Sequence, residues 1–267
     1  MGFEWILAFL VLGVVVGFMA GLLGIGGGGI MVPVLTTIFL AQGIPVEQVI
    51  HMALGTSMAS IVVTSFASMR AHHKKGAVMW DVVKVMAGGV IIGTFAATFL
   101  AAYLKSAQLA IFFAIFMAYV SIQMAIDKKP KPSRELSSST SLFSVGSLIG
   151  IVSALVSIGG GSLTVPYLIW QNVDLKKAIA TSAAIGFPLS IAGTLGYILN
   201  GMMRTSNTEE MMLGFVYLPG VVLISIMSYF TAPFGAKMAH RLPVGKLKKI
   251  FALLLMALSL KMLSSVL

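Results

Sequence analysis

Long runs of apolar residues alternate with short polar breaks along the chain, and this pattern predicts membrane-spanning helices. Seven runs are long enough to cross a hydrocarbon core of about 30 Å. They are residues 5–23, 53–71, 82–104, 109–126, 178–199, 215–238 and 247–267. Three shorter apolar pieces, 30–41, 142–156 and 163–170, are expected to form half-helices of re-entrant hairpins. We therefore predict an all-α polytopic membrane protein with about 8 to 10 membrane segments.

A glycine-rich motif occurs twice and divides the chain into two repeats. Residues 24–29 read GIGGGG and lead to Pro33, whereas residues 157–162 read SIGGGS and lead to Pro166. The segment ALGTS at 53–57 likewise has a counterpart, AIATS, at 178–182. Between the copies lies a polar, proline-containing run that cannot span a membrane. The predicted domains are a first transmembrane repeat (1–126), a cytoplasmic linker (127–141) and a second transmembrane repeat (142–267).

The distribution of basic residues predicts that the two repeats have opposite topology. Lysine and arginine gather in residues 70–75, in the linker, at 176–177 and between 237 and 249. The positive-inside rule places these segments in the cytoplasm and leaves Glu47, Glu209 and Glu210 outside. The span at 53–71 then runs inward and its counterpart at 178–199 runs outward. Inverted repeats with broken helices are typical of secondary transporters.

Composition excludes several classes of function. With 58% hydrophobic and 10% charged residues, the chain is not an ordinary soluble domain. The net charge of +10 follows from the short basic loops, so we expect no nucleic-acid partner. The chain has no cysteine, which removes disulfides and thiolate chemistry. The span interiors lack paired ionisable groups, so we expect neither an enzyme nor a cofactor or metal site. His51, near the outer start of a span, is a candidate proton relay.

The two glycine runs are the best candidates for a binding site. A helix that begins after glycines presents free backbone amides and the positive end of its dipole, which suits an oxyanion. One such helix start is too weak to hold a dehydrated anion, so several donors must converge. The hydroxyl pairs at equivalent places in the two repeats are natural additional donors. The predicted substrate-binding residues are Gly26, Gly27, Gly28, Gly29, Thr56, Ser57, Gly159, Gly160, Gly161, Ser162, Thr181 and Ser182. The alternative interpretation is that these small residues only allow close helix packing.

The duplicated glycine-rich turn leading to proline, the paired segments at 53–57 and 178–182, and the entry at 76–81 resemble the TauE/SafE sulfite exporter family, also called the 4-toluene sulfonate uptake permease family. The resemblance covers nearly the whole chain. It implies a bacterial or archaeal inner-membrane transporter of sulfur-containing anions such as sulfite, sulfonates or sulfoacetate. The expected partners are a small anion and the lipid bilayer. An anion channel and an accessory subunit without transport activity remain alternatives.

Overall fold

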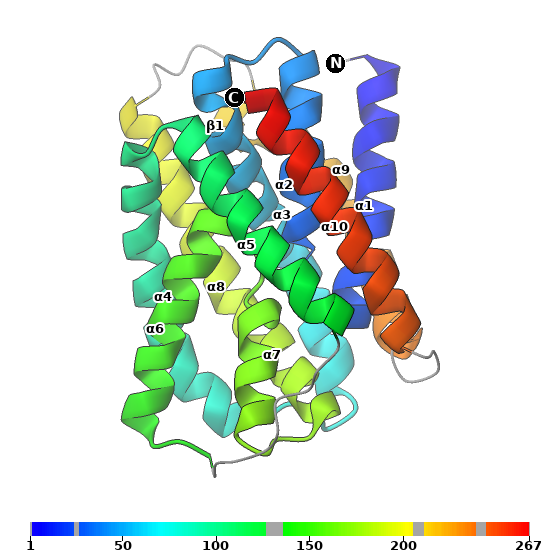
Figure 1. Ribbon diagram of the computed structural model, residues 1–267, viewed down its shortest axis with the longest axis vertical. Helices are drawn as coiled ribbons and strands as arrows, with labels where there is room; N and C mark the ends of the chain where they lie inside the picture. Colours follow the sequence, from blue (N-terminus) through cyan, green and yellow to red (C-terminus); the bar gives the residue numbers. More distant parts are fainter. Residues whose placement is uncertain (1, 24–26, 127–135, 205–210, 239–243, 267) are drawn as a thin grey trace.

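The computed structural model describes residues 2–23, 27–126, 136–204, 211–238 and 244–266. Its described part is almost entirely helical (Figure 1). The first half contains α1 (Phe3–Leu23), α2 (Gly28–Ala41), α3 (Val46–His73), α4 (Trp80–Tyr103) and α5 (Ser106–Ile126). The second half contains α6 (Ser139–Val156), α7 (Gly161–Trp170), α8 (Leu175–Arg204), α9 (Leu218–Met238) and α10 (Val244–Val266). A two-residue hairpin, β1 (Met212–Leu213) and β2 (Val216–Tyr217), precedes α9.

Seven described helices are long and apolar enough to cross a membrane: α1, α3, α4, α5, α6, α8 and α9. The protein is therefore a polytopic all-α membrane protein, as predicted. By contrast, α2 has 14 residues and α7 has 10, which correspond to about 21 Å and 15 Å of helix. These lengths confirm that both helices are too short to span a membrane alone, and each helix follows a glycine-rich turn.

Helix α6 differs from the sequence expectation, which gave residues 142–156 the length of a half-helix. It begins at Ser139 and has 18 residues, because the Ser138 side chain caps its start by accepting a hydrogen bond from the Ser141 N–H. The last residues of the serine- and threonine-rich stretch, from Ser139 on, therefore belong to α6. The boundaries of the predicted linker, 127–141, stay a prediction, because residues 127–135 lie outside the described part.

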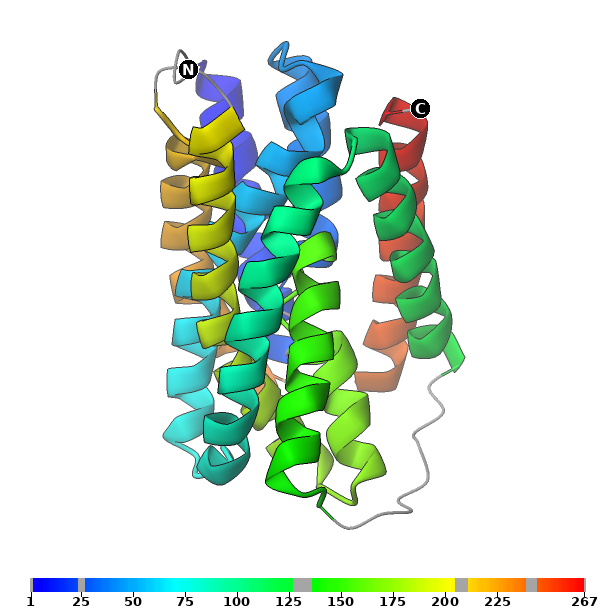
Figure 2. The same ribbon diagram turned by 90° about the vertical axis from the view of Figure 1, so that its left-hand side faces the viewer.

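The two halves run in opposite directions through the molecule. Figure 1 shows α1 and α3 descending and α8, the counterpart of α3, ascending, and Figure 2 shows α6, the counterpart of α1, ascending. Helices α5 and α10 are opposed in the same way: α10 ends near the top, whereas α5 starts high and ends lower in the view (Figure 1). This arrangement agrees with the inverted repeat that the basic loops predicted.

Helices of one half pack against helices of the other half, and glycines allow them to approach closely. The most extensive interfaces pair α1 with α9 and α4 with α6, and each joins a helix of one half to a helix of the other. A methyl group at Gly17 or Gly21 of α1 would overlap the α9 backbone at Ser228 or Ala232. A methyl at Gly93 of α4 would meet α6 in the same manner. Small residues thus bring these helix pairs into backbone contact, as is common in membranes.

Helices α3 and α8 cross at the centre, and Ser65 and Ser190 meet at this crossing. Their hydroxyl oxygens are 3.4 Å apart. Ser65 lies nine residues after Thr56, and Ser190 lies nine residues after Thr181. Residues at equivalent positions of the two repeats therefore touch each other, which is expected where a pseudo-twofold axis passes through the molecule.

Basic side chains gather at one end of the bundle. Arg70 lies in the last turn of the descending α3, and Lys74 and Lys75 come directly after it. Lys176 and Lys177 lie in the first turn of the ascending α8 (Figure 1). An excess of lysine and arginine on one side favours placing that side in the cytoplasm. Residues 209 and 210, which were expected outside, lie beyond the described residues.

Candidate functional site

Both short helices begin at a glycine in the left-handed conformation. Gly27 precedes α2 with φ of 78°, and Gly160 precedes α7 with φ of 76°. A side chain at such a φ costs about 1 to 2 kcal/mol, so glycine is the natural residue at both turns. The two turns occupy equivalent places in the two halves. Gly26, the remaining member of the first predicted set, lies outside the described residues.

These helix starts leave backbone donors free. The carbonyl of Gly27 accepts from the N–H groups of Ile30 and Met31, and the carbonyl of Gly160 accepts from Leu163 and Thr164. Within the described part of the chain, the preceding N–H groups have no acceptor. They belong to Gly28, Gly29, Gly161 and Ser162. All four residues are buried. Buried amides without a partner are uncommon, and the positive ends of two helix dipoles add to their attraction for an anion.

The two glycine turns lie next to each other in the interior. A methyl group on Gly28 would overlap the carbonyl oxygen of Ser157, which precedes the second turn. The Ser157 hydroxyl donates to the carbonyl of Leu54 in α3 at 3.1 Å. On the other side, Gly159 packs against Gly186 of α8. The second turn is thus held by α3 at Ser157 and by α8 at Gly159, and its Ser157 carbonyl lies against the start of α2.

Two hydroxyl groups in this region have no protein partner. Ser57 in α3 is fully buried, and Ser162 at the start of α7 is 7% exposed. Neither Oγ atom has a hydrogen-bond partner in the structure. Ser57 follows Leu54 by three residues and therefore shares the face of α3 that contacts the second glycine turn. An unpaired buried hydroxyl costs about 1 to 3 kcal/mol, so both atoms are candidates for a ligand contact.

The two threonines of the predicted set connect the halves. Thr56 Oγ1 accepts from the N–H of Tyr217 at 3.0 Å, directly before α9. Thr181 Oγ1 accepts from the N–H of Met79 at 3.1 Å, directly before α4. Each threonine therefore caps the start of a helix from the opposite half. Ser182 differs, because its hydroxyl donates to the carbonyl of Ile179 at 2.9 Å. A role of these three hydroxyls in substrate binding stays a prediction.

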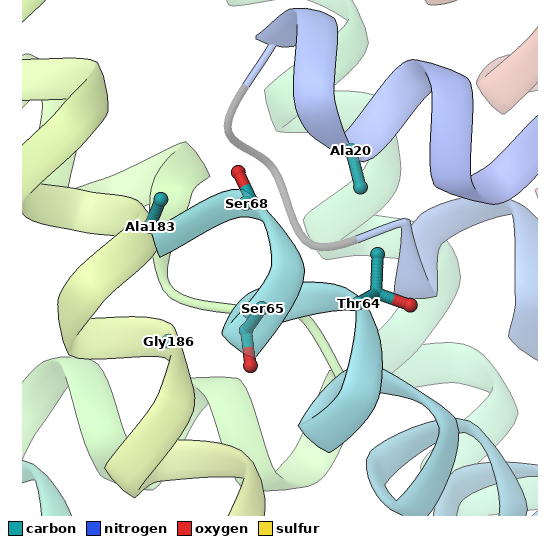
Figure 3. A pocket seen from close by; sticks show the side chains of 7 residues that line it. Ala20, Thr64, Ser65, Ser68, Ala183 and Gly186 are labelled. Atoms are coloured by element: carbon teal, nitrogen blue, oxygen red, sulfur yellow. The ribbon is translucent and has the colours of Figure 1, made fainter. Parts of the chain in front are cut away.

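A small pocket lies beside the second glycine turn (Figure 3). Its volume of about 10 Å³ has room for about one water molecule. The residues around it are Ala20, Thr64, Ser65, Ser68, Gly159, Ala183 and Gly186. Figure 3 shows the three hydroxyl residues along one stretch of α3, with α8 on the opposite side. The pocket is too small to hold a molecule larger than water.

The sequence reasoning missed the serines of this pocket. Ser68 is 3% exposed and its hydroxyl has no partner, whereas Ser65 touches Ser190. Single serines in apolar helices carry no spacing signal that separates a pore-lining hydroxyl from one that bonds its own helix. The one available signal was that Ser65 and Ser190 lie the same number of residues after the two paired threonines, Thr56 and Thr181.

His51 has a structural environment at the other end of α3. It is 5% exposed, and its Nε2 lies 3.1 Å from the carbonyl oxygens of both Ala101 and Leu104. The imidazole N–H thus satisfies carbonyls at the end of α4. The ring also packs against Phe215. His51 therefore holds α3 to α4, and its role as a proton relay stays a prediction. In the described residues, no group of three or more His, Cys, Asp or Glu side chains could hold a metal ion.

Comparison with known proteins identifies the family. The family described as Sulfite exporter TauE/SafE matches residues 9–262. A protein of Haemophilus influenzae named "Probable membrane transporter protein" is 37% identical over 262 residues, covering 97% of this chain and 98% of the relative. A similarly named protein of Methanocaldococcus jannaschii is 28% identical over 271 residues, covering 98% and 97%. No solved structure matches the chain. The chain therefore belongs to the sulfite exporter TauE/SafE family of membrane proteins.

Proposed function

We propose that the protein is a secondary transporter of small sulfur-containing oxyanions, of the sulfite, sulfonate or sulfoacetate class, in a bacterial or archaeal inner membrane. The anion binds between the starts of α2 and α7. The observation that carries this proposal is the pair of buried helix starts, one from each half, with free amides at Gly28, Gly29, Gly161 and Ser162. The family and the names of the relatives support transport in preference to catalysis.

The number of donors is sufficient to hold a dehydrated anion. Hydrogen bonds to charged groups contribute about 1.5 to 3 kcal/mol each, and a partly buried helix dipole contributes up to about 2 kcal/mol. Four amides and two dipoles therefore provide roughly 7 to 16 kcal/mol. Burying one ion costs several kcal/mol after relaxation. The hydroxyls of Ser57 and Ser162 add donors that distinguish an oxyanion from a halide, because several acceptor oxygens are needed to use them all.

The fold also offers a route to alternating access. Each half supplies one glycine turn, one short helix and one central helix, and α1 and α4 pack against helices of the opposite half. Movement of one half relative to the other would open the site to one side and then to the other, while the central donors stay in place. The small volume beside the second glycine turn is consistent with a closed state in this cycle.

Transport assays in proteoliposomes test the proposal. Purified protein is reconstituted, and efflux of radiolabelled sulfite is measured with sulfite, methanesulfonate, sulfate, acetate or chloride on the opposite side. We expect sulfite or a sulfonate to accelerate efflux by exchange, and acetate and chloride to have no effect. A channel would conduct large currents without such acceleration, and an accessory subunit would show no flux alone. Either result would refute a carrier mechanism.

A further inference from the structure

A second groove lies at the basic end of the molecule, away from the glycine turns. It is lined by α3, including the residue that ends it, and by α9, and it has a volume of about 460 Å³. The lining residues are Ala67, Arg70, Ala71, Lys74, Tyr229, Phe230, Pro233 and Phe234. None of these eight is acidic. The groove therefore has the size of a ligand site and a purely positive charge.

The two cations share one wall of the groove. Arg70 and Lys74 are one helical turn apart, so both lie on the same face of α3, and both are exposed. They occupy the last turn of α3 and the residue directly after it. A guanidinium and an ammonium at this spacing can bind different oxygens of one phosphate group.

The opposite wall is aromatic and faces outward. Phe230 is 63% exposed and Phe234 is 66% exposed, one turn further along α9. Tyr229 packs edge-on against Phe230, with ring centroids 5.6 Å apart, and is itself 39% exposed. In a membrane protein, exposed phenylalanines on a spanning helix contact lipid chains, and tyrosine suits the boundary between chains and headgroups.

From this arrangement, we propose that the groove between α3 and α9 binds an anionic phospholipid. Arg70 and Lys74 bind the headgroup phosphate, while Phe230 and Phe234 contact the acyl chain. The aromatic wall distinguishes a lipid from a free anion, because a small soluble oxyanion gains nothing from two outward-facing phenyl rings. Basic pockets between helices on the cytoplasmic side are known to attract anionic lipids. Since α3 and α9 come from different halves, the bound lipid bridges the two repeats.

Native mass spectrometry of the purified full-length protein tests this site. The probes are dioleoyl phosphatidylglycerol and dioleoyl phosphatidylethanolamine. We expect one phosphatidylglycerol to bind with clear preference. Combined Arg70→Ala and Lys74→Ala substitutions are expected to weaken its binding about 30-fold, from the contribution of each cation near a membrane surface. Phe230→Ala with Phe234→Ala is expected to weaken binding of both lipids and to lower the affinity for phosphatidylglycerol several-fold.

A matched control removes two charges from the same end of the protein. Lys176→Ala with Lys177→Ala lies outside the groove and is expected to leave phosphatidylglycerol binding within about twofold of the wild type. Equal loss in this control, or full retention after Arg70→Ala and Lys74→Ala, would refute the site. A second test uses the wild-type protein and asks whether sulfite or glycerol phosphate displaces the bound phosphatidylglycerol. Displacement of the lipid by these soluble anions at low millimolar concentration would show a free-anion vestibule and overturn the lipid assignment.

Discussion

Replacing Ser162 by alanine separates a substrate contact from a packing role. The Ser162 hydroxyl is buried at the start of α7 and has no hydrogen-bond partner in the protein. The substitution therefore breaks no internal hydrogen bond and removes only one oxygen atom. Alanine also fits the first turn of a helix without strain. A loss of function in this variant would arise from the hydroxyl itself.

We expect the Ser162→Ala substitution to leave the stability of the protein unchanged or slightly higher and to weaken sulfite binding. Removing an unpaired buried hydroxyl relieves a desolvation cost of about 1 to 3 kcal/mol, part of which is lost again as reduced packing. We therefore expect unchanged or slightly increased stability. A hydrogen bond from the hydroxyl to an anion contributes about 1.5 to 3 kcal/mol, so the dissociation constant for sulfite should rise about 10- to 150-fold. Such a trade of stability for function is typical of binding residues.

The assay combines thermal unfolding in detergent with sulfite binding by isothermal titration calorimetry. The matched control is Ser121→Ala in α5, because Ser121 is also buried and its hydroxyl also has no partner. This control should show the same small stability change and no change in sulfite affinity. If Ser162→Ala binds sulfite as tightly as the wild type, the Ser162 hydroxyl does not contact the anion, and its assignment to the binding site is wrong.

Three other predictions follow from the fold. Thr181→Val leaves the N–H of Met79 without its acceptor, so we expect a loss of about 1 to 3 kcal/mol in the free energy of unfolding, measured by thermal or denaturant unfolding; an unchanged stability would contradict the capping role. Gly160→Ala places a side chain at φ of 76° but meets its nearest atom, in Leu189, only at 3.4 Å, so it should cost about 1 to 2 kcal/mol and weaken sulfite binding. If the folded Gly160→Ala variant binds sulfite as tightly as the wild type, this turn does not contribute to the binding site. Because the chain has no cysteine, Lys75→Cys and Met203→Cys can be labelled separately in cells, and we expect reaction from opposite sides of the membrane. Labelling from the same side would contradict the inverted topology.

Much of the fold followed from sequence because membrane helices are encoded locally. Long apolar runs and basic loops specify spans and their direction, and the repeated glycines marked both short helices. The start of α6 was misjudged because Ser138 and Ser139 look like linker residues until the capping hydrogen bond is seen. Hydropathy measures apolar character and gives no weight to a serine that begins a helix.

The site was less predictable because a hydroxyl's role depends on its tertiary partners. Thr56 and Ser57 are adjacent in sequence, yet Thr56 accepts from a backbone N–H of the opposite half and Ser57 has no partner. Ser65 and Ser190 meet only because α3 and α8 cross at that level. Sequence repetition correctly indicated equivalent positions, but it could not separate residues that join the halves from residues that face a ligand.

The central claim is that backbone amides at the starts of α2 and α7 bind the anion, and a single amide signal tests it. The chain contains two Gly-Ser steps, at Ser147 and Ser162. Protein labelled with ¹³C-carbonyl glycine and ¹⁵N-serine therefore gives two correlated amide signals in solid-state NMR. Ser147 lies within α6, where its N–H is bonded in the helix, and serves as the internal control. On titration with sulfite in liposomes, the Ser162 signal is expected to shift with the dissociation constant found by calorimetry, while the Ser147 signal stays in place. Saturating sulfite that leaves the Ser162 amide unshifted would contradict the account.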